Sequence, residues 1–335
     1  MAVPLRQRIR VATYLARQRL AGRERFPLIV ELEPLFACNL ACAGCGKIQY
    51  PAHILKQRMS VEQAVAAVEE CGAPMVSIAG GEPLIHPEVH LIAEELVRRK
   101  KFVYLCTNAL LMKRKLHLFR PSPYFAWAVH IDGLRERHDQ SVCQEGVFDR
   151  AVEAIREAKA RGFRVTTNST FFTHDTPQSI RAVLDFLNDE LRVDMMMISP
   201  AYAYWKAPDQ DHFLGVEETR ALFREVFRGG TRRRWRLNHT PLYLDFLEGK
   251  VDFECTPWGI PSYSIFGWQR PCYLQADGYA RTYRELVETT DWSRYGRHSG
   301  NVQCRNCMAH CGYEPTAVLA TTRSLRQSLR ALVGS

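Results

Sequence analysis

The chain has 335 residues, of which 46% are hydrophobic and 24% are charged, a composition typical of a globular protein. No stretch approaches eighteen uninterrupted apolar residues, which excludes a membrane-spanning protein, and arginines interrupt every candidate secretory h-region. We therefore expect a soluble cytoplasmic protein, in which eleven cysteines are better explained by metal binding or catalysis than by disulfides.

The N-terminal segment carries most of the positive charge. Residues 1–25 contain seven arginines and one acid, Glu24, so they hold +6 of the net charge of +9. Apolar residues recur among the arginines at roughly helical spacing: Leu5, Ile9, Ala12, Tyr14, Leu15, Ala16 and Leu20. The pattern predicts a basic amphipathic helix, which either lies on the inner face of a membrane or packs on the domain with a solvated basic face. No nucleic-acid recognition motif accompanies this charge, so nucleic acid is not an expected partner.

Short apolar runs alternate with helix-periodic stretches from residue 28 onward. The runs predict strands at 28–33, 75–79, 102–107, 125–131, 163–168 and 194–199. Helices are predicted near 60–71, 87–100, 112–118, 145–161, 176–190 and 217–228. The alternation predicts an α/β fold with six βα units in an open, partial (β/α)6 barrel. We place this barrel at 26–230, between the N-terminal helix at 1–25 and a cysteine-rich extension at 231–335.

A cysteine-rich loop follows the first predicted strand, at the end of the barrel where catalytic residues gather. Cys38, Cys42 and Cys45 have C-x3-C-x2-C spacing, and Gly44 and Gly46 let the loop wrap closely around a cluster. A structural zinc or an electron-transfer cluster needs a fourth ligand, whereas three thiolates on a [4Fe-4S] cluster leave one iron open to a substrate. The alternative, three buried cysteines without metal, requires this spacing and position to arise by chance.

This loop resembles the signature of the radical S-adenosylmethionine (SAM) superfamily, and the resemblance covers about residues 26–200. It departs from the usual pattern because Ala43 and Gly44 stand between the last two cysteines, where an aromatic residue is often found. The resemblance implies that the open iron binds the amino and carboxylate groups of SAM. One-electron reduction then cleaves SAM to methionine and a 5′-deoxyadenosyl radical.

Further rim residues are candidates for binding SAM. Gly80, Gly81 and Glu82 directly follow the second predicted strand and resemble the family's binder of the SAM amino group, although alone they could form an ordinary turn. Polar residues also follow the next three strands and could hold ribose and carboxylate, or cap the helices that follow: Asn108, Asp132, Asn168 and Ser169.

Cys106 lies near the end of the third predicted strand. A thiol hydrogen is readily abstracted, so this cysteine could quench a product radical. The alternative is that Cys106 is a small apolar filler of the core.

The C-terminal third carries a second group of cysteines. Cys255, Cys272, Cys304 and Cys307 resemble, in their layout, the auxiliary-cluster extension called twitch that follows some radical SAM barrels; Cys311 has no obvious role in it. The resemblance implies a second iron-sulfur cluster. The same thiols could hold a structural zinc, or form a reduced loop without metal.

A second resemblance, to the adenosylhopane synthase family of hopanoid biosynthesis, covers nearly the whole chain. Four blocks carry it: the basic start through Phe26-Pro27-Leu28, and residues 38–51, 255–259 and 271–274. It implies that the 5′-deoxyadenosyl radical adds to the terminal alkene of diploptene, an apolar triterpene. Hydrogen transfer, for which Cys106 would be the donor, then yields adenosylhopane. SAM is consumed, and the electron comes from a low-potential donor such as flavodoxin or ferredoxin.

Apolar residues late in the barrel and in the extension agree with such a substrate, or with ordinary core packing. They are Met195, Met196, Met197, Tyr202, Tyr204, Trp205, Trp258, Tyr263, Phe266, Trp268 and Tyr273. Two other functions remain open. One is a radical SAM enzyme with an auxiliary cluster that modifies a peptide, sugar or cofactor. The other is a non-enzymatic metal-binding regulator, which would not need an open cluster beside Gly80, Gly81 and Glu82.

Overall fold

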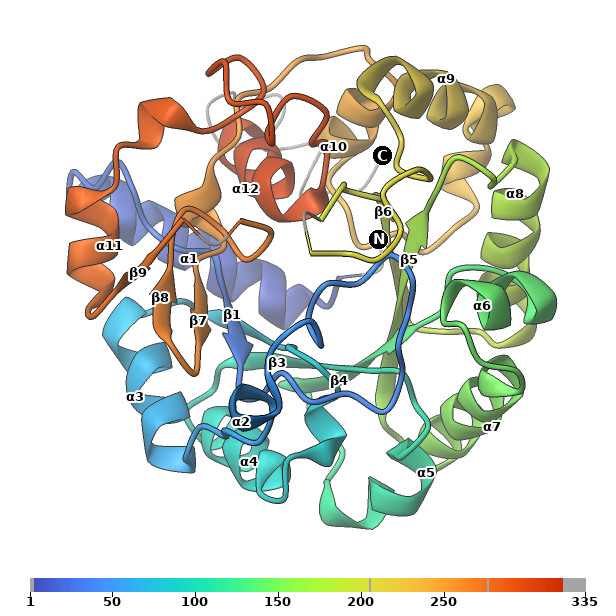
Figure 1. The fold of residues 1–335 in the computed structure, drawn as a ribbon, viewed down its shortest axis with the longest axis horizontal. Coiled ribbons are helices and arrows are strands. Elements are labelled where there is room, and N and C mark those ends of the chain that lie inside the picture. Colours follow the sequence, from blue (N-terminus) through green and yellow to red (C-terminus); the bar gives the residue numbers. More distant parts are fainter. Residues whose placement is uncertain (1–2, 205, 276, 322–335) are drawn as a thin grey trace.

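Six parallel strands form the centre of the fold, and the predicted partial barrel is confirmed (Figure 1). The computed structural model describes residues 3–204, 206–275 and 277–321, so the prediction for Trp205 lies outside the described residues. The barrel strands are β1 (Ile29–Glu33), β2 (Met75–Ile78), β3 (Phe102–Thr107), β4 (Phe125–His130), β5 (Arg164–Phe171) and β6 (Met195–Pro200). Each strand pairs in parallel with the next along the chain.

Helices surround the strands, as Figure 1 shows. They are α3 (Val61–Cys71), α4 (Val89–Arg98), α5 (Met112–Lys115), α6 (Arg135–Ser141), α7 (Val147–Ala160), α8 (Pro177–Asp185) and α9 (Val216–Val226). Helix α3 begins at a capping box, in which Ser60 accepts from the Gln63 N–H, and ends at Gly72 with a φ of 73°. These local signals explain why the predicted helix positions agree with the structure.

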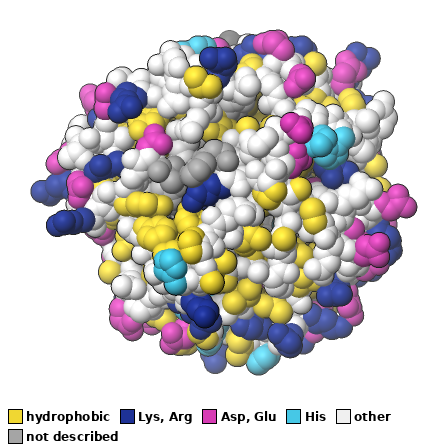
Figure 2. All heavy atoms as spheres, viewed as in Figure 1, with side chains coloured by type: hydrophobic (Ala, Val, Ile, Leu, Met, Phe, Trp, Pro, Cys, Tyr) yellow, Lys and Arg dark blue, Asp and Glu magenta, His cyan; other side chains and the backbone are white. Residues whose placement is uncertain are grey.

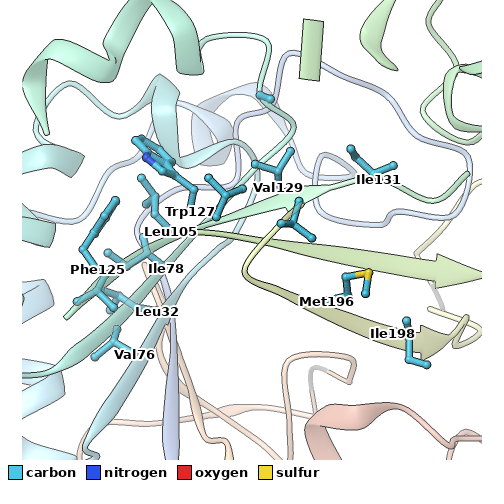
Figure 3. Close-up of a cluster of buried hydrophobic side chains, with 14 of the residues drawn as sticks. Leu32, Val76, Ile78, Leu105, Phe125, Trp127, Val129, Ile131, Met196 and Ile198 are labelled. Carbon is cyan, nitrogen blue, oxygen red and sulfur yellow. The ribbon is translucent and has the colours of Figure 1, made fainter. Parts of the chain in front are cut away.

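The main core lies between the sheet and these helices. Alternate side chains of each strand point outward, because successive residues of a strand face opposite sides of the sheet. Figure 3 shows Leu32, Ile78, Leu105, Trp127 and Met196 within this cluster, and all five are fully buried. The other side chains of each strand point into the barrel, where the sequence is more polar.

The C-terminal extension continues the barrel sheet. Strand β7 (Ser262–Ser264) pairs in parallel with β1, and β8 (Gly267–Gln269) and β9 (Tyr279–Ala280) follow as an antiparallel ribbon. The complete strand order is β6-β5-β4-β3-β2-β1-β7-β8-β9. The extension also contributes α10 (Pro241–Leu247), α11 (Tyr283–Thr289) and α12 (His310–Thr321). The boundary predicted at residue 230 is therefore not a break in the sheet.

Helix α1 (Leu5–Leu20) packs at the amino end of the barrel strands. Its Gln7 Nε2 donates to the Tyr104 hydroxyl at 2.7 Å and contacts the sulfur of Met75, the first residue of β2. Leu15 is buried in a cluster with Phe26 and Leu28. The helix thus covers part of the barrel at the end opposite the cysteine loop. None of the described helices has the length and hydropathy needed to cross a bilayer.

Candidate active site

The loop that carries Cys38, Cys42 and Cys45 is held against the loop after β2. The N–H groups of Gly81 and Glu82 donate to the carbonyls of Leu35 and Ala37, at 3.0 and 2.9 Å. A Cβ at Gly81 would lie 2.1 Å from the Ala37 oxygen. Glycine is required here because two backbones approach closely, which brings Gly80–Glu82 beside the cysteine loop.

The three thiols of this loop line one large cavity. Burial raises the pKa of all three, that of Cys38 to about 11, and their mutual repulsion adds to the effect at Cys38 and Cys42. Thiols in such a setting become thiolates only when a cation stabilises them, which is what the irons of a cluster do. The Leu40 N–H already donates to Cys38 Sγ at 3.4 Å. The donor set and its setting fit a three-cysteine cluster.

Glu82 is fully buried beside this loop and lines the cavity. Burial raises its pKa to about 7, although three donors oppose the shift: the N–H groups of Asn108 and Leu84 and the Thr107 hydroxyl. These bonds measure 2.8 to 2.9 Å and join the end of β3 to the loop after β2. Glu82 therefore orders the rim, and its oxygens retain further lone pairs for a cationic ligand.

Three of the four polar rim candidates line the cavity: Asn108, Asp132 and Asn168. Asn108 Nδ2 donates to the Asn39 side chain at 2.8 Å, beside Cys38. Burial opposes ionisation of Asp132, yet an ion pair with His130 at 2.9 Å lowers its pKa to about 2. The Asn168 side-chain oxygen is buried without a partner among the described residues, so it is available to a donor on a ligand.

Ser169 does not fit its predicted role. It is fully buried, its hydroxyl donates to the Ile131 carbonyl, and it is not among the residues that line the cavity. Asn168 and Ser169 are adjacent in β5, so their side chains point to opposite faces of the sheet. Only Asn168 can reach a ligand inside the barrel.

Cys106 lines the cavity, between its two ends. Its thiol lies 3.5 Å from the Ser77 hydroxyl, and burial raises its pKa to about 12, with a further contribution from Glu31. The group is therefore a neutral thiol near pH 7. A neutral S–H has a hydrogen atom to donate, whereas a thiolate does not.

The sequence interpretation missed three charged residues of the cavity wall, Glu31, Glu33 and Lys47. Lys47 Nζ lies 2.5 Å from Glu33 Oε1, and the rings of Phe36 and Tyr273 flank the ammonium group. Burial raises the pKa of Glu31 to about 8, and repulsion by Glu33 adds to the shift. The alternation in β1, where Val30 and Leu32 face the core, was a signal that both acids face inward.

One cavity of about 1320 Å³ connects all these groups. It extends from Cys38 and Glu82 at the carboxyl ends of the strands, past Cys106, to Met75 and α1 at the amino end. Figure 2 shows the molecule from the side used in Figure 1; hydrophobic side chains gather near the centre and charged ones toward the edge. The volume exceeds the 300–1000 Å³ usual for one small-molecule pocket. The cavity has room for two ligands at once.

Of the apolar residues noted late in the barrel and in the extension, some line this cavity: Met197, Tyr202, Tyr204 and Tyr273. Others belong to the core or lie outside the cavity: Met195, Met196, Trp258, Tyr263, Phe266 and Trp268. The predicted apolar wall of the substrate cavity is therefore supported by four of these residues and not by the others.

The C-terminal cysteines come together in the structure. Burial raises the pKa of Cys255 well above its usual value, and Cys307, Cys272, Cys311 and Cys304 all add to the shift by repulsion. Gln275 Nε2 donates to Cys304 Sγ at 3.0 Å. No three His, Cys, Asp or Glu side chains in the described part of the chain are arranged around a single-ion site. A second cluster remains a prediction.

Comparison with known families divides the chain in two. Residues 32–187 match the Radical SAM superfamily, and residues 196–331 match a domain of unknown function, DUF3463. The second match begins in β6, so the last barrel strand falls within it.

Characterised relatives share the first part of the chain. The Fe-coproporphyrin III synthase of Methanosarcina barkeri is 24% identical over 187 residues, which make up 55% of this chain and 46% of that protein. The GTP 3′,8-cyclase of Aquifex aeolicus is 26% identical over 140 residues, 39% of this chain and 44% of that protein. In these alignments the chain spans about half the length of the relatives it matches.

Solved structures share the fold. SuiB of Streptococcus suis bound to S-adenosylmethionine superposes with a TM-score of 0.61 at 18% identity, covering 76% of this chain and 62% of SuiB. The protein anSMEcpe with bound AdoMet gives a TM-score of 0.61 at 16% identity, covering 92% of this chain and 98% of that one. At such low identity the likeness establishes the architecture alone.

Proposed function

We propose that this chain, whose residues 32–187 match the Radical SAM superfamily, transfers the 5′-deoxyadenosyl group of SAM to the alkene of diploptene. It is a radical SAM enzyme, with a [4Fe-4S] cluster and SAM as its cofactors. When bound, these supply the 5′-deoxyadenosyl radical. The lipid substrate and the addition reaction are the proposed part, and they rest on resemblance to adenosylhopane synthases and on the cavity.

The cavity is the observation that carries this proposal. Its rim end holds the three cysteines, Glu82 and Asn108, which suit the polar parts of SAM. Toward the amino end its wall includes Val11, Leu15, Ile29, Met75 and Val318. Two pairs of polar side chains there are bonded to each other, Gln7 with Tyr104 and His239 with Glu314. An elongated apolar molecule suits the apolar part of this wall, because it needs no hydrogen bonds from these paired groups.

The residues of this chain then take distinct roles. Cys38, Cys42 and Cys45 would hold the cluster, and Gly80, Gly81 and Glu82, which line the cavity beside them, would bind the SAM amino group. Asn108, Asp132 and Asn168 are available to ribose and carboxylate oxygens. Cys106 lines the cavity between its polar and apolar parts. In the proposed reaction its S–H gives a hydrogen atom to the carbon radical on the lipid, and the thiyl radical left on Cys106 is returned to the thiol by one electron from the external donor and a proton.

A second function has support from the comparisons. The relatives are named for coproporphyrin, haem and GTP chemistry, and one solved structure of SuiB contains a precursor peptide. These names favour a radical SAM enzyme that modifies a peptide, sugar or cofactor, for which the gathered C-terminal cysteines would hold an auxiliary cluster. We expect a peptide to bind at the rim, because α1 covers part of the other end of the barrel.

The products distinguish the two functions. We expect the reconstituted enzyme, incubated anaerobically with SAM, a strong reductant and diploptene, to yield a lipid heavier by one adenosyl group in mass spectrometry. Free 5′-deoxyadenosine without an adenosylated lipid would overturn the proposal and support the alternative. Absence of any SAM cleavage would leave only a metal-binding regulator.

Replacing the thiol tests the hydrogen donor. Cys106→Ala should cleave SAM at the rate of the unaltered enzyme yet lose most of the reduced adenosylated lipid. Cys71→Ala is the matched control, because Cys71 is also a buried thiol but lies at the end of α3, outside the cavity wall. Unchanged product formation by Cys106→Ala would remove Cys106 from the mechanism.

A further inference from the structure

Helix α1 presents an apolar stripe to solvent. Leu5, Ile9 and Leu20 are 60%, 56% and 90% exposed. Four other large hydrophobic side chains in the described residues are exposed, and they are scattered over other parts of the chain: Leu91, Leu118 and Leu134 at 38–40%, and Val302 at 71%. A cluster of exposed apolar side chains on one helix marks an interaction surface, whereas single ones do not.

Arginines accompany this stripe. Arg6, Arg10 and Arg17 are exposed, and none of them forms an ion pair with a described residue. Arginines on other helices do form such pairs, as Arg98 does with Glu95 in α4 and Arg220 with Glu217 in α9. The helix has no acid in its first turn. Its outer surface is therefore both apolar and positively charged.

The cavity ends beside the same helix. Gln7, Val11 and Leu15 of α1 line it from inside the fold. Ala12 and Ala16 also line it and are exposed to solvent, so the cavity reaches the surface along α1. Arg233, Arg234 and Arg236, which are exposed too, line the cavity near this opening. The opening lies at the amino end of the barrel, whereas the cluster loop lies at the carboxyl end.

We propose that α1 docks the amino end of the barrel on an anionic lipid bilayer, and that the opening beside α1 admits the apolar substrate directly from that bilayer. The substrate part of this inference rests on the proposed function. SAM then reaches the cluster from the opposite end of the same cavity.

The combination of the two side-chain types favours a bilayer over other anionic partners. Arginines alone would suit the phosphates of nucleic acid or of lipid headgroups. Three exposed aliphatic side chains on the same helix have no partner on a nucleic acid backbone, but they can enter the boundary between headgroups and acyl chains. A helix lying in that plane also places the nearby opening against the lipid.

Two triple variants of the full-length holoenzyme test the docking. Leu5→Gln, Ile9→Gln and Leu20→Gln together remove the apolar stripe, and Arg6→Gln, Arg10→Gln and Arg17→Gln together remove three charges. None of these six residues lines the cavity. The matched control changes three exposed arginines elsewhere to glutamine, Arg58, Arg120 and Arg156, and so removes the same charge.

Binding is measured by co-sedimentation with vesicles of phosphatidylcholine, with and without 30% phosphatidylglycerol. We expect the unaltered enzyme to bind the anionic vesicles and to release them at high salt. The arginine variant should bind about 100-fold more weakly, since each arginine near an anionic surface contributes about 1 kcal/mol. The apolar variant should bind at least about tenfold more weakly, and the control should bind like the unaltered enzyme.

A turnover assay distinguishes a failure of the membrane-docking proposal from a failure of the proposed function. Both variants should lose product formation from diploptene embedded in anionic vesicles, yet retain it with detergent-dispersed diploptene. If the unaltered enzyme makes product but does not bind vesicles, or if it binds RNA and vesicles do not displace the RNA, the docking is wrong. If it binds vesicles through α1 but makes no adenosylated lipid in detergent, the docking stands and the proposed function fails.

Discussion

Two acids of β1 face the cavity, but only Glu33 has a cationic partner at ion-pair distance, Lys47 at 2.5 Å. Glu31 lies beside Ser77 in the strand register and near Cys106. Two carboxylates so close cannot both ionise at low cost in a site shielded from water, so the one without the ion pair keeps its proton. Glu31 is therefore a neutral acid in the middle of the cavity at neutral pH.

Glu31→Gln should make stability less sensitive to pH. The pKa of Glu31 is raised from 4.5 to about 8 on folding, so its favourable contribution is complete below pH 4.5 and is lost progressively as pH rises through 8. Glutamine cannot ionise, so the stability of the variant should rise relative to that of the unaltered protein by about 4 kcal/mol from pH 5 to pH 9. Urea denaturation across that range measures the difference.

Glu94→Gln serves as the control, because Glu94 is exposed on α4 and its replacement should not alter the pH dependence. If Glu31→Gln and the unaltered protein differ by the same amount at pH 5 and pH 9, Glu31 is already ionised in the folded protein.

Among the individual site residues, those that belong to a short sequence motif were predicted. Those whose position depends on which face of a strand they occupy were missed. Cys38, Cys42 and Cys45 lie close together in space because all three belong to one loop segment of eight residues, and all three line the cavity. Ser169 failed as a ligand because a one-residue step along β5 turns its side chain away from the cavity. Lys47 could not be assigned, since it lies in a loop and its contact with Glu33 of β1 is made only when that loop folds over the end of the barrel.

Between elements, the contact of two loops holds the cysteine loop in position. The loop after β2 meets the loop after β1 through backbone hydrogen bonds, and the missing side chain of Gly81 allows that approach. Glu82 then ties the same loop to the end of β3. The carboxyl ends of β1, β2 and β3 are thus joined at the rim of the barrel that carries the cysteine loop.

Gly81→Ala should disrupt this contact. The new methyl group would meet two backbone oxygens, those of Ala37 and Phe36, and neither can move like a flexible side chain. Overpacking of this kind costs about 1–3 kcal/mol, and we expect reduced iron content after reconstitution together with weakened SAM binding. Iron analysis, cluster absorbance and calorimetric SAM binding report the effect.

Gly215→Ala is the matched control, because the nearest atom to its added Cβ is the end of the Glu218 side chain, 3.3 Å away. Full iron loading and unchanged SAM affinity in Gly81→Ala would show that the two loops can separate without loss of the site.

The predicted elements of the barrel agree with the structure because each carries its own signal. The strands are four to eight residues long and carry apolar or β-branched side chains, and α3 has both a capping box and a glycine stop. Strands β7, β8 and β9 were missed, since runs of two or three residues carry no periodicity to detect. Their pairing depends on β1, more than two hundred residues earlier in the chain.

The whole molecule is held together by that distant pairing. Trp268 in β8 is fully buried, its indole N–H donates to Glu70 of α3 at 2.9 Å, and its ring packs against Tyr263. The extension and the barrel therefore share one sheet and one core. We expect them to unfold together.

Trp268→Ala should destabilise the complete chain by about 3–5 kcal/mol, as removal of a fully buried aromatic side chain does. Urea denaturation followed by circular dichroism, which reports mainly the barrel helices, should shift to lower midpoint in a single transition. Trp258→Ala should cost less, because Trp258 is half-buried and lies outside the sheet. A separate early transition that leaves the barrel signal unchanged would mean that the extension is an independent unit.

The two-ended cavity also bears on how a catalytic cycle would begin and end. Ligands that arrive from opposite ends do not block each other, so either can bind first and initial-rate kinetics should follow random order. In the proposed reaction the joined product would span both halves of the passage, with its nucleoside near the cysteine loop and its hydrocarbon near α1. Whichever way it leaves, one half must travel through surroundings suited to the other, which makes product release a natural candidate for the slow step.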